Sequence, residues 1–231
     1  MRNSNNYKLV SKRQFLCDEL EASEIKLAEV NGSIFVCMTD KRLEPSAQVA
    51  NLILKFNEKL SILNKLYLIG IAVLSFESCD GKLYFLAENE SDSKKRIFVY
   101  DENLNELERI GQREEQNLPF YVPDNVGKMR ISADFFVLYS SANSCLTMMN
   151  RADGVAENRW LNPKHEDFVV DRDSNLIFWY DSNSNQLLVV DEDGQYFIED
   201  FGFIRGGELK LVGCHEGKLV FFDSLNFLFL F

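Results

Sequence analysis

The chain has 231 residues, of which 46% are hydrophobic and 13% aromatic, and its formal net charge is −11. This apolar share is too high for a disordered chain, and the length suits one all-β domain. No Pro- or Ser-rich linker separates two parts of different composition. We therefore expect a single domain over residues 1–231.

The negative charge is concentrated in one part of the chain. Residues 161–200 contain ten acidic residues, and their only basic residues are Lys164 and Arg172. Proteins that bind nucleic acid usually carry a basic stripe, because neutralising phosphates supplies much of their affinity. No such stripe is visible, so we expect no nucleic acid partner. A basic protein is the partner that this charge favours.

Compartment and membrane signals are weak in this sequence. The longest apolar run, from Leu66 to Phe76, is far shorter than a membrane span, and the N-terminus lacks the apolar core of a secretory signal. The five cysteines stand apart and form neither a C-x-x-C pair nor an even-numbered disulfide framework. These features predict a cytoplasmic protein without membrane contact, and we expect a monomer.

The dominant pattern is a short apolar strand that follows a turn residue and recurs five times. Aligning Ile34, Leu83, Phe136, Ile177 and Leu219 gives successive spacings of 49, 53, 41 and 42 residues. One four-stranded blade of a β-propeller takes about 40–50 residues. The spacing therefore predicts an all-β fold, a β-propeller of four-stranded blades.

Each repeat divides into the same series of strands, separated by turns rich in Asn, Asp and Gly, as tight hairpins require. In chain order, the expected strands are 24–30, 31–36, 51–56 and 59–68; 70–76, 80–86, 96–101 and 104–111; 128–132, 133–139, 144–149 and 154–161; 167–171, 174–180, 186–191 and 194–202; and 208–213, 216–222 and 226–231.

The fifth repeat has only three expected strands. Residues 7–16 form an unassigned strand-like segment, and pairing them with residues 226–231 would complete this blade. Such closure would also cover an apolar edge that otherwise invites aggregation. We therefore expect five blades, with the N-terminal strand closing the last one. The alternative is a fragment of a six-bladed ring.

Residues 14–30 allow a second interpretation. Their Glu and Ala spacing suits an amphipathic helix, although the last part of this segment overlaps the first expected strand. Elsewhere Val, Ile, Phe and Tyr dominate the apolar runs, which favours strands.

Residues 171–202 read DRDSNLIFWYDSNSNQLLVVDEDGQYFIEDFG, and this stretch resembles an NHL-type repeat. The matching positions are Asn175, Asp181, Asn185, Asp191, Asp193, Gly194, Phe201 and Gly202. Segments 96–111 and 135–154 are more weakly similar. The resemblance extends to the broader TolB-like group of six-bladed propellers. It implies a platform that binds protein, or RNA on a basic face, and the sequence shows no basic face.

The same resemblance implies an alternative function. Some TolB-like propellers are metal-dependent lactonases that gather carboxylates and amides around the central channel. In this sequence Asp171, Asp173 and Asn175 have the spacing of a calcium loop, but Leu176 and Ser182 occupy the positions that need Gly and Glu. Asp and Asn are also common hairpin residues, so we interpret this segment as a turn.

Other catalytic or metal signatures are missing. His165 and His215 are fifty residues apart, without the clustered spacing of a zinc site. There is no nucleophile elbow, phosphate-binding loop or dinucleotide fingerprint. We therefore predict no catalytic residues, no metal and no cofactor.

Four residues are candidates for binding. Asp191, Glu192 and Asp193 follow a strand, and they would form part of an acidic face if equivalent turns of the blades share one end of the ring. Trp160 leads into a loop and would be a plausible hot spot if exposed, with packing as the competing interpretation. Trp179 lies inside a strand, which predicts packing between blades.

These observations favour a non-enzymatic interaction platform that binds a protein partner through the loops of one face. A metal-dependent hydrolase that uses the central channel is the alternative.

Overall fold

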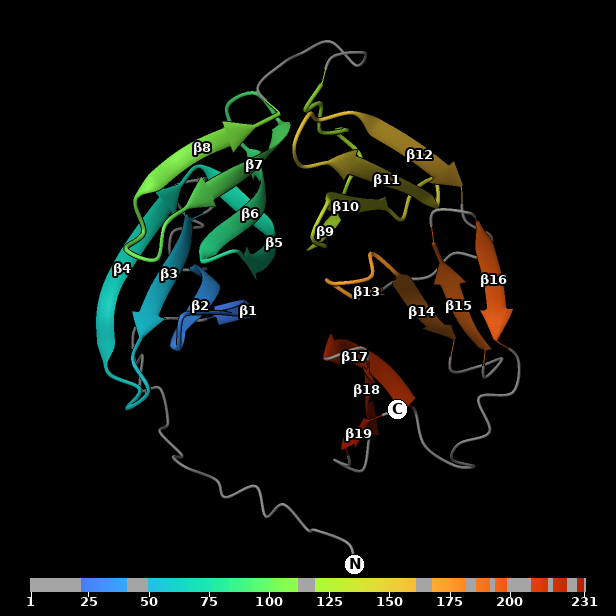
Figure 1. The fold of residues 1–231 in the computed structure, drawn as a ribbon. Helices are drawn as coiled ribbons and strands as arrows, with labels where there is room; N and C mark the ends of the chain where they lie inside the picture. The colour runs from blue at the N-terminus through green and yellow to red at the C-terminus, as the bar shows by residue number, and fades with distance from the viewer. Residues whose placement is uncertain are drawn as a thin grey trace, which may run out of the picture.

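The structure, a computed structural model, describes residues 22–40, 50–111, 119–160, 168–181, 186–191, 194–198, 209–215, 218–223 and 228–230. These residues form five antiparallel sheets arranged around an axis, with no helix among them (Figure 1). None of their elements is therefore a helix that could cross a membrane. The fold is a five-bladed β-propeller.

Each blade is a meander of strands that are consecutive in sequence. Blade 1 holds β1 (Ala22–Val30), β2 (Ser33–Asp40), β3 (Ala50–Phe56) and β4 (Ile62–Ile69); blade 2 holds β5 (Ile71–Cys79), β6 (Lys82–Asn89), β7 (Lys94–Tyr100) and β8 (Glu106–Ile110). Blade 3 holds β9 (Lys128–Ile131), β10 (Phe135–Ser140), β11 (Cys145–Asn150) and β12 (Ala156–Trp160). Blade 4 holds β13 (Val169–Val170), β14 (Ile177–Asp181), β15 (Gln186–Val190) and β16 (Gln195–Ile198), and blade 5 holds β17 (Leu209–His215), β18 (Lys218–Asp223) and β19 (Leu228–Leu230).

The five blades and their strand order confirm the repeat read from the sequence. All five expected turn-and-strand signals correspond to the second strands of the blades, β2, β6, β10, β14 and β18. The predicted pairing of residues 7–16 with residues 226–231 lies outside the described residues. The same holds for the start of the helix considered at residues 14–30.

The helical interpretation is wrong for residues 22–30, which form β1. This strand pairs antiparallel with β2, with Val30 opposite Ser33 and Leu27 opposite Val36. Asn31 and Gly32 form the turn between them with positive φ angles of 49° and 76°. An Asn-Gly pair is suited to both positions of such a hairpin turn. Pairing with the next strand therefore overrides the helix propensity of the Glu and Ala residues.

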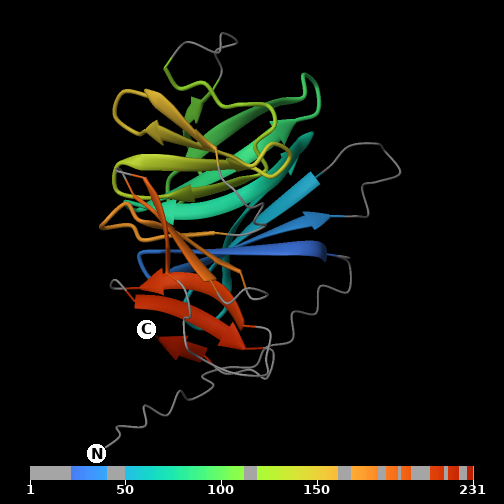
Figure 2. The ribbon, with the colours of Figure 1, turned by 90° about the vertical axis from the view of Figure 1, so that its right-hand side faces the viewer.

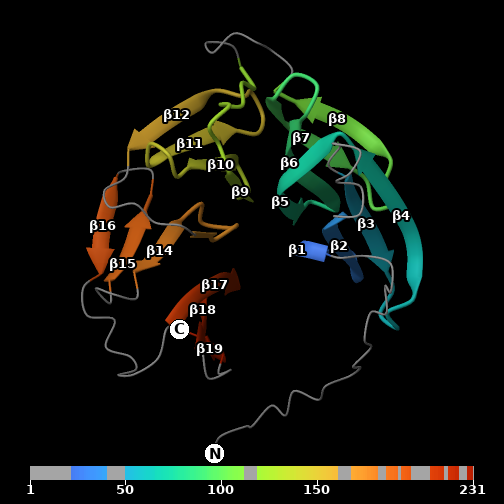
Figure 3. The same ribbon diagram turned by 180° about the vertical axis from the view of Figure 1, so that it is seen from behind.

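The strands of each blade run outward from the axis. The first strands β1, β5, β9, β13 and β17 lie nearest the axis, and β4, β8, β12 and β16 lie at the rim, as both views along the axis show (Figures 1 and 3). Figure 2 shows the same blades from the side. Consecutive innermost strands pack against each other from β1 to β17. A buried hydrogen bond joins two of them, from the Ser75 hydroxyl to the Met129 carbonyl at 2.9 Å.

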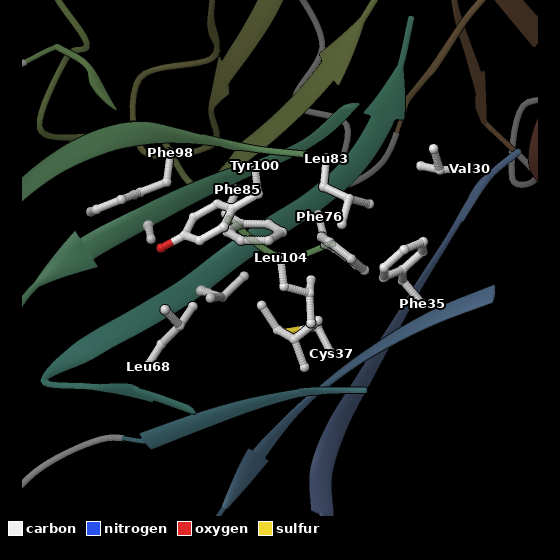
Figure 4. Close-up of a cluster of buried hydrophobic side chains, with 13 residues drawn as sticks. Val30, Phe35, Cys37, Leu68, Phe76, Leu83, Phe85, Phe98, Tyr100 and Leu104 are labelled. Carbon is white, nitrogen blue, oxygen red and sulfur yellow. The ribbon is translucent and has the colours of Figure 1, made fainter. Parts of the chain in front are cut away.

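The hydrophobic core is divided into layers between neighbouring blades. The layer between blades 1 and 2 gathers Phe35 and Cys37 from one sheet and Phe76, Leu83 and Phe85 from the other (Figure 4). Separate clusters join blade 2 to blade 3, blade 3 to blade 4 and blade 4 to blade 5. A sheet between two neighbours is covered on both faces, which explains continuous apolar runs such as 83–87 in β6.

Arg151 fastens blade 3 to blade 2. Its guanidinium donates hydrogen bonds to Asp80 Oδ2 at 2.6 Å and to the Tyr84 hydroxyl at 3.3 Å. It also donates to the carbonyls of Ser132 at 3.0 Å and Ala133 at 2.8 Å. The Arg151 side chain is only 16% exposed. One half-buried cation therefore satisfies acceptors from two blades at once.

Candidate functional site

Alternate turns of the blades meet at one end of the ring, which we call the turn face. It comprises the turns between first and second strands and those between third and fourth strands, at residues 31–32, 57–61, 80–81, 101–105, 132–134, 151–155, 171–176, 191 and 194. Hydrogen bonds between blades hold these turns together. Asn31 Nδ2 donates to Glu102 at 3.0 Å, and Asn175 Nδ2 donates to Asp134 at 2.8 Å.

The turn face is acidic. Its basic residues are Lys59, Arg151 and Arg172, whereas its acidic residues are Glu58, Asp80, Asp101, Glu102, Asp134, Asp153, Asp171, Asp173 and Asp191. Hydrogen bonds from Asn105 hold the pKa of Asp101 below its usual range, and the Arg151 guanidinium lowers the pKa of Asp80. These two carboxylates therefore stay charged at neutral pH.

Several of these carboxylates also build their own turns. Asp171 accepts hydrogen bonds from the Ser174 hydroxyl at 2.5 Å and the Asp173 amide at 3.4 Å. Asn175, the third residue of the calcium-like spacing, instead reaches across to Asp134. Asp171 thus stabilises the turn that the sequence predicted, and Asn175 links this turn to blade 3.

Asp191 lies on the turn face, half-buried after β15. Its Oδ1 accepts the Gly194 amide at 2.9 Å, and its carbonyl accepts a hydrogen bond from Arg159 of blade 3. Glu192 and Asp193 lie outside the described residues. Arg159 and Trp160 are adjacent on β12, so their side chains leave opposite faces of the strand. The structure therefore does not bring Asp191 and Trp160 into one site.

Trp160 lines a groove of about 740 Å³ on the outer part of blade 3, which we call the Trp160 groove. Its side chain is 65% exposed. Thr147 and Asn158 are paired across β11 and β12, and the Thr147 hydroxyl hydrogen-bonds the Asn158 side chain at 2.6 Å. Cys145 faces Trp160 in the same ladder. One wall of the groove is therefore a sheet face with amide, hydroxyl and aromatic groups.

The other wall is the connector that leads from blade 2 into blade 3, at residues 119–126. The Phe120 amide donates to the Gly154 carbonyl at 3.0 Å. Gly154 has a φ of +73°, and a Cβ there would lie 2.4 Å from the Phe120 nitrogen. Glycine is therefore required for this close approach. Pro119, Tyr121 and Pro123 of the same connector line the groove.

The central channel forms a second cavity of about 900 Å³, lined by residues of all five innermost strands. Arg130 donates to Glu77 Oε1 at 2.6 Å and to the Phe168 carbonyl at 3.3 Å, so it links blades 2, 3 and 4. Glu77 is the one carboxylate that an innermost strand contributes to this lining, and it is engaged by Arg130. Lys26 and Lys128 also line the channel. The Arg130 contacts in this channel therefore hold neighbouring blades together.

Metal-binding geometry is missing from the described part of the chain. No three His, Cys, Asp or Glu side chains come together there in a way that would hold an ion. His165 lies outside the described residues, and His215 ends β17. Among the described residues of the channel lining, the carboxylates of Glu77, Asp171 and Asp173 do not gather into such a cluster, which is the arrangement that the hydrolase alternative would need.

The comparisons with known proteins support the fold. A protein of unknown function from Bacteroides caccae is 10% identical with a TM-score of 0.58, and the match covers 86% of this chain and 70% of that one. The β-propeller domain of the Trilobed protease from Pyrococcus furiosus, described as having an open velcro topology, is 10% identical with a TM-score of 0.52, over 91% and 69% of the two chains. Glutaminyl cyclase from Myxococcus xanthus is 14% identical with a TM-score of 0.47, over 88% and 87%.

At these identities the first two likenesses show a β-propeller and nothing finer. No family model matches the chain, and no curated protein matches it.

Sequence reasoning singled out Trp160 and Asp191 but missed the surroundings of both. The groove wall at residues 119–126 lies in a connector without a strand pattern. Arg151 and Asp80 are 71 residues apart, and Arg130 and Glu77 are 53 apart. The nearest sequence signal was Gly154 after the Asn-Arg-Ala-Asp turn, which indicates a tight turn and says nothing of what packs against it.

Proposed function

We propose that the chain is a non-catalytic platform that binds a protein partner, with the Trp160 groove at the centre of the contact. The observation that carries this proposal is the exposure of Trp160 at the wall of a groove large enough for several side chains. Tryptophan is enriched among residues that dominate binding energy, because it buries a large rigid surface and keeps an N–H donor.

The chemistry of the groove supports a protein ligand. Its lining combines Tyr121 and two prolines with the amides of Asn143 and Asn158. Apolar surface beside a few fixed polar groups is the usual composition of a binding site. The groove walls are also fixed in place, one by the sheet of blade 3 and the other by the Phe120–Gly154 contact. A preformed site loses less conformational entropy on binding.

The partner is a basic protein in this proposal. The acidic turn face adjoins the groove, because Gly154 and Val155 belong to both. Opposite charges accelerate association and make it sensitive to salt. The NHL-type resemblance of residues 171–202 agrees with a platform role, and we place the protein in the cytoplasm.

The proposal is tested by affinity purification of the tagged full chain from its own cells, in wild-type form and as Trp160→Ala. We expect the recovery of specific partners to fall at least tenfold with Trp160→Ala, because the aromatic anchor is lost. The matched control is Tyr67→Ala, which removes another exposed aromatic side chain from the outer strand of blade 1. It should retain the partners.

The charge of the partner is tested with Asp191, Glu192 and Asp193 replaced by Lys. Binding of the recovered partner should weaken in this variant and, for the wild type, as salt is raised. Recovery of the same partners in the same amounts from Trp160→Ala would contradict the proposed function. An unchanged salt dependence in the charge-reversed variant would contradict only the role of the acidic turn face, and the rest of the proposed function would stand.

A further inference from the structure

In the part of the chain that the structure describes, no strand pairs with the outer side of β12. It is the outermost strand of blade 3, at the edge of a sheet ordered β12, β11, β10, β9. The Asn150 amide donates to the Val155 carbonyl at 2.8 Å, which identifies this pair as a hydrogen-bonded one. Hydrogen-bonded and non-hydrogen-bonded pairs alternate along an antiparallel ladder. Ala156 and Asn158, opposite Met149 and Thr147, therefore point their backbone N–H and C=O groups away from β11.

A hollow lies on each face of this strand. Ala156, Asn158 and Trp160 face the Trp160 groove. Glu157 and Arg159 face a second pocket of about 400 Å³, which also includes Asp153. Alternate side chains of a strand point to opposite faces of its sheet. A strand added beside β12 would place successive side chains over the two hollows in turn.

The two hollows differ in charge. The side chains that line the Trp160 groove include one carboxylate, that of Asp124, and no Lys or Arg. The second pocket contains Asp153 and Glu157, and the Glu157 side chain is 67% exposed. Arg159 is its one cation, and it is held by Glu157 at 3.2 Å and by the Asp191 carbonyl. The groove side therefore favours apolar or aromatic side chains, whereas the pocket side favours cations.

We propose that β12 binds an extended segment of the partner protein as an added strand, and that this segment alternates apolar or aromatic residues with Lys or Arg. This inference rests on the proposed function and names the form of the ligand. Main-chain hydrogen bonds to Ala156 and Asn158 supply a sequence-independent part of the affinity, and the two hollows supply specificity.

The outer strand of blade 2 shows what a protected edge looks like. In β8, Glu106 and Glu108 alternate with Leu107 and Arg109, so both faces carry charge. Charged side chains on both faces are a common protection of edge strands against pairing. On β12 the charged residues Glu157 and Arg159 occupy one face and pair with each other, which leaves the Trp160 face uncharged.

The test begins with a phage-displayed library of random 12-residue peptides, panned on the full chain. We expect the enriched peptides to alternate apolar or aromatic residues with Lys or Arg. Their affinity should fall at least tenfold for Ala156→Pro, which removes one outward N–H. The matched control Ala156→Val keeps that N–H and should bind within threefold of the wild type.

Binding is read from tryptophan fluorescence, because Trp179 is fully buried and Trp160 is 65% exposed. A bound peptide should protect Trp160 from acrylamide quenching. A second test uses the wild-type protein only, so it does not depend on how Ala156→Pro folds. Two versions of the peptide are compared, one N-methylated at its odd-numbered residues and one at its even-numbered residues. One version should lose binding and the other should keep it, because an added strand forms hydrogen bonds to β12 with every second residue.

The outcomes separate this inference from the proposed function. Peptides that bind with equal affinity in both N-methylated versions, or that show no alternation, would overturn strand addition. Panning that enriches no peptide would also overturn it. Loss of partners with Trp160→Ala would still support the proposed function in each of these cases.

Discussion

The two tryptophans of this chain lie in opposite environments. Trp179 has no exposed surface and packs between blades 3 and 4 against Tyr139 and Phe168, with ring centroids 6.1 and 5.2 Å away. Trp160, on the outermost strand of blade 3, is 65% exposed. Trp179 lies among the apolar and aromatic residues of β14, whereas Trp160 follows the polar residues Glu157, Asn158 and Arg159 at the end of β12. Distance from the axis decides their roles, because both faces of the inner part of a blade are covered by its neighbours.

This contrast extends to polar groups. Between blades 2 and 3, Arg151 satisfies acceptors of both sheets and is itself largely shielded from solvent. At the rim, the outward amides of Ala156 and Asn158 belong to the edge of a sheet. The polar groups between blades 2 and 3 are therefore satisfied within the ring, whereas the outward groups of β12 are the ones that the proposed strand addition would use.

The largest expected effect sharpens the contrast between the two tryptophans. Trp179→Ala should lower the free energy of unfolding by about 3–5 kcal/mol, because it leaves a cavity in a closed layer. Trp160→Ala should change it by no more than about 0.5 kcal/mol, as surface substitutions usually do. Urea denaturation of both variants measures the difference. Equal losses would mean that Trp160 is part of the core.

A smaller loss of stability is expected from a substitution at Gly154, which lines the Trp160 groove. Gly154→Ala should destabilise the protein by about 2–4 kcal/mol, because it combines a positive φ with a steric clash against the Phe120 backbone. Gly127→Ala is the matched control, since its Cβ would meet nothing within 4 Å and its φ is not positive. Thermal and urea denaturation compare the two. A Gly154→Ala variant as stable as the control would show that the connector does not depend on this contact.

The smallest loss of stability is expected only at high pH, and it concerns the hydrophobic layer between blades 1 and 2. Burial raises the pKa of Tyr100 to about 12, and the neighbouring Glu106, which accepts its hydrogen bond at 3.1 Å, adds to the rise. An unfolded tyrosine loses its proton near pH 10. Tyr100 therefore contributes fully below pH 10, and stability falls by about 2 kcal/mol between pH 10 and pH 12.

Tyr100→Phe should reduce the slope of stability against pH in this window. The measurement is urea denaturation at several pH values from 9 to 12. A slope as steep as that of the wild type would assign the alkaline loss to other groups.

The sequence predicted the blades and their strands, but it predicted neither the contacts between blades nor the Trp160 groove. Strand order follows from local signals, namely apolar runs of the right length and turns such as Asn31-Gly32. The error at residues 22–30 arose because helix propensity is a weak term that pairing with β2 outweighs. The contact of Arg151 with Asp80 depends on how two sheets pack, which no local pattern encodes. The Trp160 groove likewise depends on where residues 119–126 run beside blade 3.

The order of contacts along the ring has a consequence for biosynthesis. Every blade pairs strands that are adjacent in sequence, and each innermost strand packs on the one made just before it. A ribosome synthesises the chain at about 5–20 residues per second, so each blade can fold against the preceding blade while the next one is still being translated. Blade 2 obtains its Arg151 contact only after the end of β11 has emerged, 71 residues after Asp80. Folding should therefore proceed from the N-terminal blades onward, with each new blade burying the exposed face of the previous one.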